Sequence, residues 1–317
     1  MYQISRKVTG VADVVFLERA FHKLMLNFSW WANRKDRYGR NLFEGGFLGL
    51  DNIGAFDRSQ IGVAGAHLEQ ADATAWMSAY CVDMLCIALE LSQHSIAYED
   101  VASKFFEHFM TIAHSIYGDS VSGQPGLWHE EDGFFYDHLR TGGGRVPVKA
   151  KSFVGLIPLF ACMTIDERLL DKLPSFKARM SWFLSHRKHL IARHSTLISE
   201  PKVIGSQPLA SPSVTPITVS VMMSGSQAAP GGTRTVPATP AAVDGVNAMQ
   251  VRVGCSATVA GVPIAEPMPA SSEQHGCRLL SLVAEEHLPR ILERMLSEAE
   301  FLSPFGLRSL SKEHETA

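Results

Sequence analysis

Residues 69–92, EQADATAWMSAYCVDMLCIALELS, are the stretch on which the rest of the fold depends. At helical spacing, apolar side chains occupy two sides of this segment. One side carries Trp76, Tyr80, Met84, Ile87 and Leu91, and another carries Ala75, Ala79, Val82, Cys86 and Leu89. A helix that is apolar nearly all round is covered on several faces. We therefore predict a central helix here, with other elements packed around it.

Helical spacing recurs on both sides of this segment. Residues 12–31 and 100–117 each place their apolar side chains on a single stripe. Glu99 and Asp100 supply negative charge at the start of the second of these helices, where the helix dipole favours it. Shorter helices are predicted at 153–163, 174–186 and 285–298. The chain therefore reads mainly as a series of helices.

One short stretch has strand character. Residues 133–137 and 145–149 read as a hairpin around Gly142, Gly143 and Gly144. Helix pairs joined by long loops fit a helical array or an (α/α) toroid better than a sheet protein. We predict an all-α fold with one small β-hairpin.

The segment 195–275 differs in composition from both of its flanks. Residues 201–270 contain ten of the sixteen prolines and only five charged residues, and no Phe, Trp or Tyr occurs between Phe183 and Phe301. Such a segment cannot bury enough apolar surface to offset its ordering entropy. We predict a disordered insertion at 195–275 between a domain at 1–194 and its continuation at 276–317. A translated intron would have the same appearance, and transcript sequencing across related genes would test that hypothesis.

Composition and charge exclude several classes of function. The formal net charge is −3, so no basic field suggests nucleic acid or an anionic membrane as a partner. The five cysteines are scattered without a C-x-x-C pair, which argues against a zinc site or a disulfide framework. His108 and His114 lie six residues apart and do not share a helix face, which disfavours a metal site between them. Without a signal peptide or a long apolar run, we expect a cytoplasmic protein.

The loop at 45–59, GGFLGLDNIGAFDRS, carries the densest set of functional side chains. It places Asp51, Asn52, Asp57 and Arg58 among glycines and aromatic residues. Glycines let a loop turn tightly and approach a ligand, and a carboxylate there could protonate a glycosidic oxygen. The alternative is structural, because Asp and Asn also cap helices and pin turns. Spacing alone leaves both interpretations open.

Several blocks outside the middle segment resemble bacterial-type proteins of glycoside hydrolase family 63, which includes processing α-glucosidases and mannosylglycerate hydrolases. The resemblance extends over nearly all of the chain apart from 195–275. The matching blocks are 16–19, 30–36, 45–59, 68–77, 98–109, 126–137 and 301–311.

The resemblance implies an (α/α)6 catalytic barrel, here partial, that hydrolyses glycosidic bonds with inversion. The family's general acid is an Asp in a Gly-(Leu/Trp)-Asp-(Asn/Asp) motif, which falls here on residues 49–52 and identifies Asp51 as the acid. Asn52, Asp57 and Arg58 follow as substrate contacts. The implied substrate is an oligosaccharide or small glycoside of the glucosidase or mannosidase type, and no metal or organic cofactor is implied.

The catalytic base is the missing part of this assignment. In the family the second carboxylate lies beyond the block that ends here at Ser311, and further barrel helices precede the block that begins at Phe16. We therefore expect a catalytically incomplete fragment with no measurable turnover on its own. One alternative is an inactive helical-repeat module that binds carbohydrate or a partner protein. Another is a separately encoded chain that completes the barrel.

Four further side chains are candidates for substrate binding. Asp72 and Trp76 open the central helix, where Asp72 could instead act as a cap or dipole partner. Trp128 and Glu130 combine an indole with a carboxylate, which suits a pyranose ring. An acidic turn is also commonly just solvated. His129 departs from the acidic residue expected from the resemblance, and Trp30 and Trp31 are predicted to be core residues.

Overall fold

The computed structural model describes residues 1–33, 39, 41–44, 58, 65–119, 123–187, 190 and 276–315. The chain divides into two compact units, Met1–Val203 with Gln274–Ala317, and Ile204–Glu273. Every described residue belongs to the first unit. The predicted disorder of 195–275 and the candidate residues Asp51, Asn52 and Asp57 lie outside the described residues.

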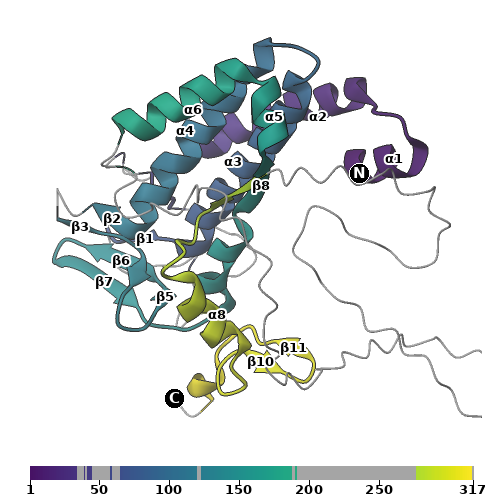
Figure 1. The fold of residues 1–317 in the computed structure, drawn as a ribbon. Helices are drawn as coiled ribbons and strands as arrows, with labels where there is room; N and C mark the ends of the chain where they lie inside the picture. The colour runs from purple at the N-terminus through teal and green to yellow at the C-terminus, as the bar shows by residue number, and fades with distance from the viewer. Residues whose placement is uncertain are drawn as a thin grey trace, which may run out of the picture. The chain divides into compact units, whose positions relative to one another are not determined.

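Helix α3 (Ala71–Ser92) is the central element, as predicted. It contacts α2 (Val14–Ala32), α4 (Ala97–Tyr117), the 3₁₀ helix η1 (Phe153–Phe160) and strand β8 (Cys162–Asp166). Figure 1 shows it enclosed by these elements. The side chains of Met84 and Leu85 are completely buried, as expected of a helix that is apolar on several faces.

Helix α2 packs on α3 through a single apolar stripe of Leu17, Phe21 and Phe28. The Asp13 carboxylate caps its start by accepting a 2.9 Å hydrogen bond from the backbone N–H of Phe16. Before it lies α1 (Tyr2–Thr9), which was not predicted. The Tyr2 hydroxyl donates a 2.9 Å hydrogen bond to Glu90, and this bond joins α1 to the end of α3.

Helices α5 (Glu167–Lys172) and α6 (Pro174–His186) follow strand β8, and α6 lies against α4. Phe106 of α4 meets Phe176 and Phe183 of α6 edge to face. Glu99, which we predicted to serve the dipole of its own helix, accepts a 2.8 Å hydrogen bond from the backbone N–H of Phe176. It therefore serves the first turn of α6, where helix N–H groups lack partners within the helix.

The prediction of an all-α fold, or of a partial (α/α)6 toroid, was wrong. The described part contains a three-stranded antiparallel sheet in the order β1 (His67–Glu69), β6 (Asp137–Thr141), β7 (Gly144–Val148). Four two-stranded antiparallel pairs accompany it. They are β2 (Gly118–Asp119) with β3 (Gln124–Pro125), β4 (Trp128–His129) with β5 (Phe134–Phe135), β8 with β9 (Cys277–Ser281), and β10 (Leu302–Ser303) with β11 (Gly306–Leu307). The fold is mixed, with helices and small sheets in one unit.

Two predicted elements changed for identifiable reasons. The hairpin around the glycines exists, but its strands are β6 and β7, and residues 134–135 pair instead with 128–129. The predicted helix 153–163 is the 3₁₀ helix η1 followed by strand β8. Pro158 has no N–H for an α-helical ladder, and the β-branched Thr164 and Ile165 favour a strand.

Residues 276–315 fold together with the first part of the chain. Strand β9 pairs with β8 in the register Cys162↔Ser281 to Asp166↔Cys277. The predicted helix at 285–298 is α8 (Leu288–Leu296), and the described chain closes with η2 (Lys312–His314). The Ile291 and Phe301 side chains are fully buried, so this part contributes to the same core.

By length and composition, α3 is the one described helix that could cross a membrane. This differs from the expectation that no segment is long and apolar enough. Within its most apolar window, 61% of the helix is buried in the fold. The core helix of a folded unit shows the same features.

Candidate functional site

Arg58 is the candidate from the loop 45–59 that the structure describes, and it lies in a buried ion cluster. Its guanidinium donates to both carboxylate oxygens of Asp72, at 2.8 Å from Nη1 to Oδ2 and 2.5 Å from Nη2 to Oδ1. Its Nε lies 2.9 Å from Oδ2 of Asp137. Asp72 is completely buried, and Arg58 and Asp137 nearly so. A buried guanidinium is tolerated when it is paired on several sides, as it is here.

The local sequence explains why this cluster forms at the start of α3. Asp72 occupies the first turn of the helix, and Asp137, the first residue of β6, accepts a 2.8 Å hydrogen bond from the backbone N–H of Ala71. Carboxylates are favoured at a helix N-terminus because N–H groups and the dipole point toward them. Arg58 then pairs with both carboxylates that the helix start gathers.

Phe43, which precedes the segment 45–57, is also bonded to the first turn of α3. The backbone N–H of Phe43 donates to Thr74 Oγ1 at 3.1 Å, and its carbonyl accepts from the backbone N–H of Gln70 at 3.1 Å. Phe43 and Thr74 are both buried. The described residues on both sides of the segment 45–57 therefore meet at the first turn of α3.

A second buried carboxylate lies beside this cluster. Glu69 of β1 is completely buried, with Arg140 Nε at 3.1 Å from one oxygen and Arg145 Nε at 2.5 Å from the other. Arg145 also donates to the Gly126 carbonyl at 2.9 Å. These pairs fasten β6 and β7 to the strand that leads into α3.

Burial shifts the protonation of two neighbouring groups. It raises the pKa of Asp137 to about 6, an effect that Arg58 opposes and the nearby Asp72 adds to. Burial also lowers the pKa of His138 to about 4, helped by the positive charge of Arg145. The polar region beside α3 therefore contains two groups that titrate below neutrality.

Trp76 lies one helical turn after Asp72 and is 42% exposed. It lines a pocket of about 370 Å³ together with Trp31, Tyr80 and Asp83, and the remaining lining residues are Ala73, Met77 and Ala79. Burial raises the pKa of the Asp83 carboxyl group. Trp31 is partly buried, but Trp30 is 52% exposed, so the prediction that Trp30 is a core residue was wrong.

Trp128 and Glu130 belong to a different cluster, which joins the β4–β5 turn to α8. The Trp128 indole N–H donates to Glu130 at 2.8 Å, and Arg290 Nη1 donates to the other Glu130 oxygen at 2.6 Å. The Arg290 guanidinium lies 5.7 Å from the Trp128 ring centre, and the His287 ring lies 4.4 Å from it. Glu130 is therefore paired with Trp128 and Arg290, although its side chain is 71% exposed.

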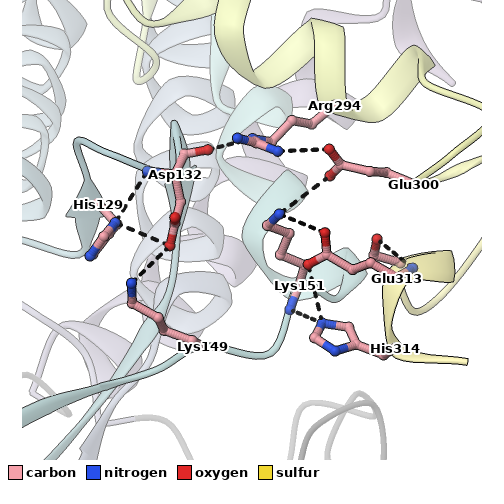
Figure 2. A network of polar contacts seen from close by, with 9 residues as sticks. His129, Asp132, Lys149, Lys151, Arg294, Glu300, Glu313 and His314 are labelled. Carbon is pink, nitrogen blue, oxygen red and sulfur yellow. Dashed lines mark hydrogen bonds and ion pairs between the residues drawn. The ribbon is translucent and has the colours of Figure 1, made fainter. Parts of the chain in front are cut away.

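This cluster continues into a network of ion pairs with the last described residues, shown in Figure 2. Asp132 contacts His129 at 3.1 Å and Lys149 at 3.2 Å, and its backbone carbonyl accepts from Arg294. Arg294 pairs with Glu300 at 2.6 Å, and Lys151 pairs with Glu313 at 2.8 Å. His129, which departs from the family pattern, thus serves a structural contact.

Sequence analysis did not select Glu69, Asp137 or Asp83 as candidate site residues. Asp137 directly follows three buried aromatic residues, and a carboxylate in such a setting needs a partner, so a signal was present. Glu69 and Asp83 gave no comparable signal on their own helix or strand. Among the described ranges, no group of three or more His, Cys, Asp or Glu side chains could hold a metal ion.

Comparisons with known proteins identify a relative without assigning an activity. No protein-family profile matches the chain, and no solved structure matches it. A protein of Saccharomyces cerevisiae (strain ATCC 204508 / S288c), named Uncharacterized protein YMR196W, is 38% identical over 325 residues. That alignment covers 99% of this chain and 23% of the yeast protein. The chain thus spans less than a quarter of the length of this relative.

Proposed function

We propose that the chain carries the acid half of a glycoside hydrolase site similar to that of family 63. Asp51 donates a proton to the leaving glycosidic oxygen, and Asn52 and Asp57 contact the sugar. The substrate is an oligosaccharide or small glycoside of the glucosidase or mannosidase type, and the reaction inverts the anomeric configuration. The motif at residues 49–52 supplies the assignment of the acid.

One structural observation supports this proposal most directly. Buried hydrogen bonds and ion pairs hold both described flanks of the segment 45–57 at the first turn of α3, through Phe43 on one side and Arg58 on the other. Catalytic groups need support from packed neighbours, because a displacement of about 1 Å can cost a large part of the rate.

The burial of Asp72 and Arg58 assigns them a positioning role. Both oxygens of Asp72 accept from Arg58, and neither side chain is open to solvent. Direct contacts between these two residues and a sugar therefore do not form part of the proposal. They act by fixing the chain seven residues after Asp51.

The experiment measures glycoside cleavage by the whole chain with and without azide. In an inverting reaction the acid protonates the aglycone oxygen while a nucleophile attacks the anomeric carbon from the opposite face. Azide can replace the water that a catalytic base would activate. We expect methyl and nitrophenyl α-glucosides or α-mannosides to give the inverted glycosyl azide and the free alcohol.

The Asp51→Asn variant tests the role of the acid. We expect it to slow reaction of the methyl glycoside by about 10²- to 10⁴-fold, the usual contribution of a general acid. The rate with the nitrophenyl glycoside should fall much less, because its leaving group needs little protonation. Glu131→Gln, at an exposed carboxylate outside the candidate site, serves as the matched control. Equal rates for Asp51→Asn and the unaltered chain, or no product from any glycoside, would contradict the proposal.

A further inference from the structure

The described lining of the pocket beside α3 combines three aromatic side chains with one carboxylate. Trp76, Tyr80 and Asp83 lie on one face of α3 at a spacing of four and three residues, and Trp31 of α2 completes the wall. Aromatic faces carry partial negative charge, and cations are attracted to them, most strongly to Trp. Among the described residues that line this pocket, none is Lys, Arg or His. The lining therefore complements a positive charge.

Asp83 adds a full negative charge. Among the described residues, no hydrogen bond or ion pair is made by its side chain, although it is partly desolvated by the pocket. Partial burial raises the pKa of its carboxyl group. A carboxylate in this position would be stabilised by a cationic ligand.

The C-terminal end of α2 also reaches this pocket, through Trp31. Trp31 lies in the last turn of this helix, which ends at Ala32 without a basic residue in that turn. The carbonyl groups of a helix C-terminus carry partial negative charge and favour cations. Trp31 of α2 therefore meets Trp76, Tyr80 and Asp83 of α3 around one pocket of about 370 Å³.

We propose that this pocket binds an organic cation, specifically a methylated ammonium group. A primary ammonium has three N–H donors and needs several acceptors, whereas the lining offers one carboxylate. A quaternary ammonium needs no acceptor, and its methyl groups suit the apolar walls of Ala73 and Met77. Aromatic residues with a carboxylate are the usual surroundings of such groups in proteins. The observations behind this proposal do not include Asp51 or the proposed hydrolase reaction.

The test titrates the whole chain with choline and with tetramethylammonium, followed by tryptophan fluorescence and calorimetry. We expect saturable binding of both cations. The neutral isostere 3,3-dimethylbutanol should bind at least about tenfold more weakly, because only the charge is removed. Methyl glucoside provides the third ligand, since the sequence predicts Trp76 as a substrate-binding residue.

Two variants identify the residues responsible. We expect Trp76→Ala and Asp83→Asn each to weaken choline binding by roughly 3- to 30-fold, the range of cation–π energies at partly desolvated sites. Both positions are exposed, so the fold should persist, and a thermal melt checks this. Trp182→Ala, at an exposed tryptophan of α6 that is not among the described lining residues, is the matched control.

Several outcomes would overturn the proposal. Equal binding of choline and its neutral isostere would reduce the pocket to a simple apolar cavity. Binding of methyl glucoside without choline would make it a sugar site. Absence of cation binding, or binding unaffected by both variants, would refute the assignment directly. A failed hydrolase test with intact choline binding would remove only the function proposed for Asp51.

Discussion

At the scale of single residues, the Arg58 cluster is the feature with the largest consequence. Its guanidinium and the Asp72 carboxylate are 4% and 0% exposed, so water cannot replace a lost partner. Removing one member of a buried pair leaves the other charge without a partner and lowers the free energy of unfolding by about 3–5 kcal/mol. Removing one partner of an exposed ion pair with a similar N–O distance has no such effect on stability, because water solvates both ions.

We expect Arg58→Met to lower the free energy of unfolding by about 3–5 kcal/mol in urea denaturation. Arg58→Lys should lower the free energy of unfolding by less, because lysine keeps the positive charge. Some stability should still be lost, because lysine cannot bind a carboxylate with two parallel hydrogen bonds. Lys177→Met is the control: Lys177 lies 2.6 Å from Asp171 in an exposed pair, and its loss should cost at most about 1 kcal/mol. Equal losses for Arg58→Met and Lys177→Met would show that burial of the cluster contributes nothing.

Asp137 and His138 are adjacent residues with opposite pH dependence. The folded-state pKa of His138 is lowered to about 4, so its stabilising effect is complete above pH 6.5 and is lost as pH falls toward 4. The folded-state pKa of Asp137 is raised to about 6, so the folded state gains stability as pH falls from 6 toward 3.8. The two effects oppose each other between about pH 4 and 6.

Single variants should separate these two effects. In His138→Gln we expect the free energy of unfolding to rise as pH falls from 6 to 4, and in Asp137→Asn we expect it to fall, each by a few kcal/mol. Urea midpoints at a series of pH values measure this. His94→Gln, at an exposed position, is the control and should follow the unaltered chain. Variant curves parallel to that of the unaltered chain would mean that neither group is perturbed.

At the scale of elements, the longer α-helices could be predicted and most strands could not. Helical periodicity is a local signal, and α2, α3, α4 and α6 follow it closely. Strands of two to five residues have little pattern of their own. Strand β8 pairs with β9 more than a hundred residues later, and β1 pairs with β6 across α3 and α4. These pairings depend on tertiary packing, which a periodicity argument does not contain.

The same limit applies to the candidate site. Arg58 could be singled out because it lies among other polar side chains in a glycine-rich loop, and Asp72 because it opens a helix that is otherwise mostly apolar. Their meeting, and the part taken by Asp137, depends on how three distant segments pack. The Trp76 pocket could be foreseen only in part, since Asp83 lies at an ordinary exposed helix position.

At the scale of the whole chain, residues 276–315 are joined to 1–190 by the β8–β9 ladder, by buried side chains and by the network of Figure 2. Phe301 stacks on Phe134 with ring centres 5.7 Å apart and is completely buried. Phe305, four residues later, is fully exposed. These contacts are those of a protein core and do not depend on the covalent connection between the two parts.

We therefore expect the two parts to stay together after a protease site engineered within 204–273 is cut. Gel filtration of the cut chain should show one complex that separates only in denaturant. Phe301→Ala removes a buried ring, and the loss of its packing costs about 3–5 kcal/mol of stability. The two parts of this variant should therefore separate more readily. Phe305→Ala alters an exposed ring in the same block and should leave the complex intact. Separation of the cut, unaltered chain without denaturant would show that the covalent link, and not the shared core, holds residues 276–315 in place.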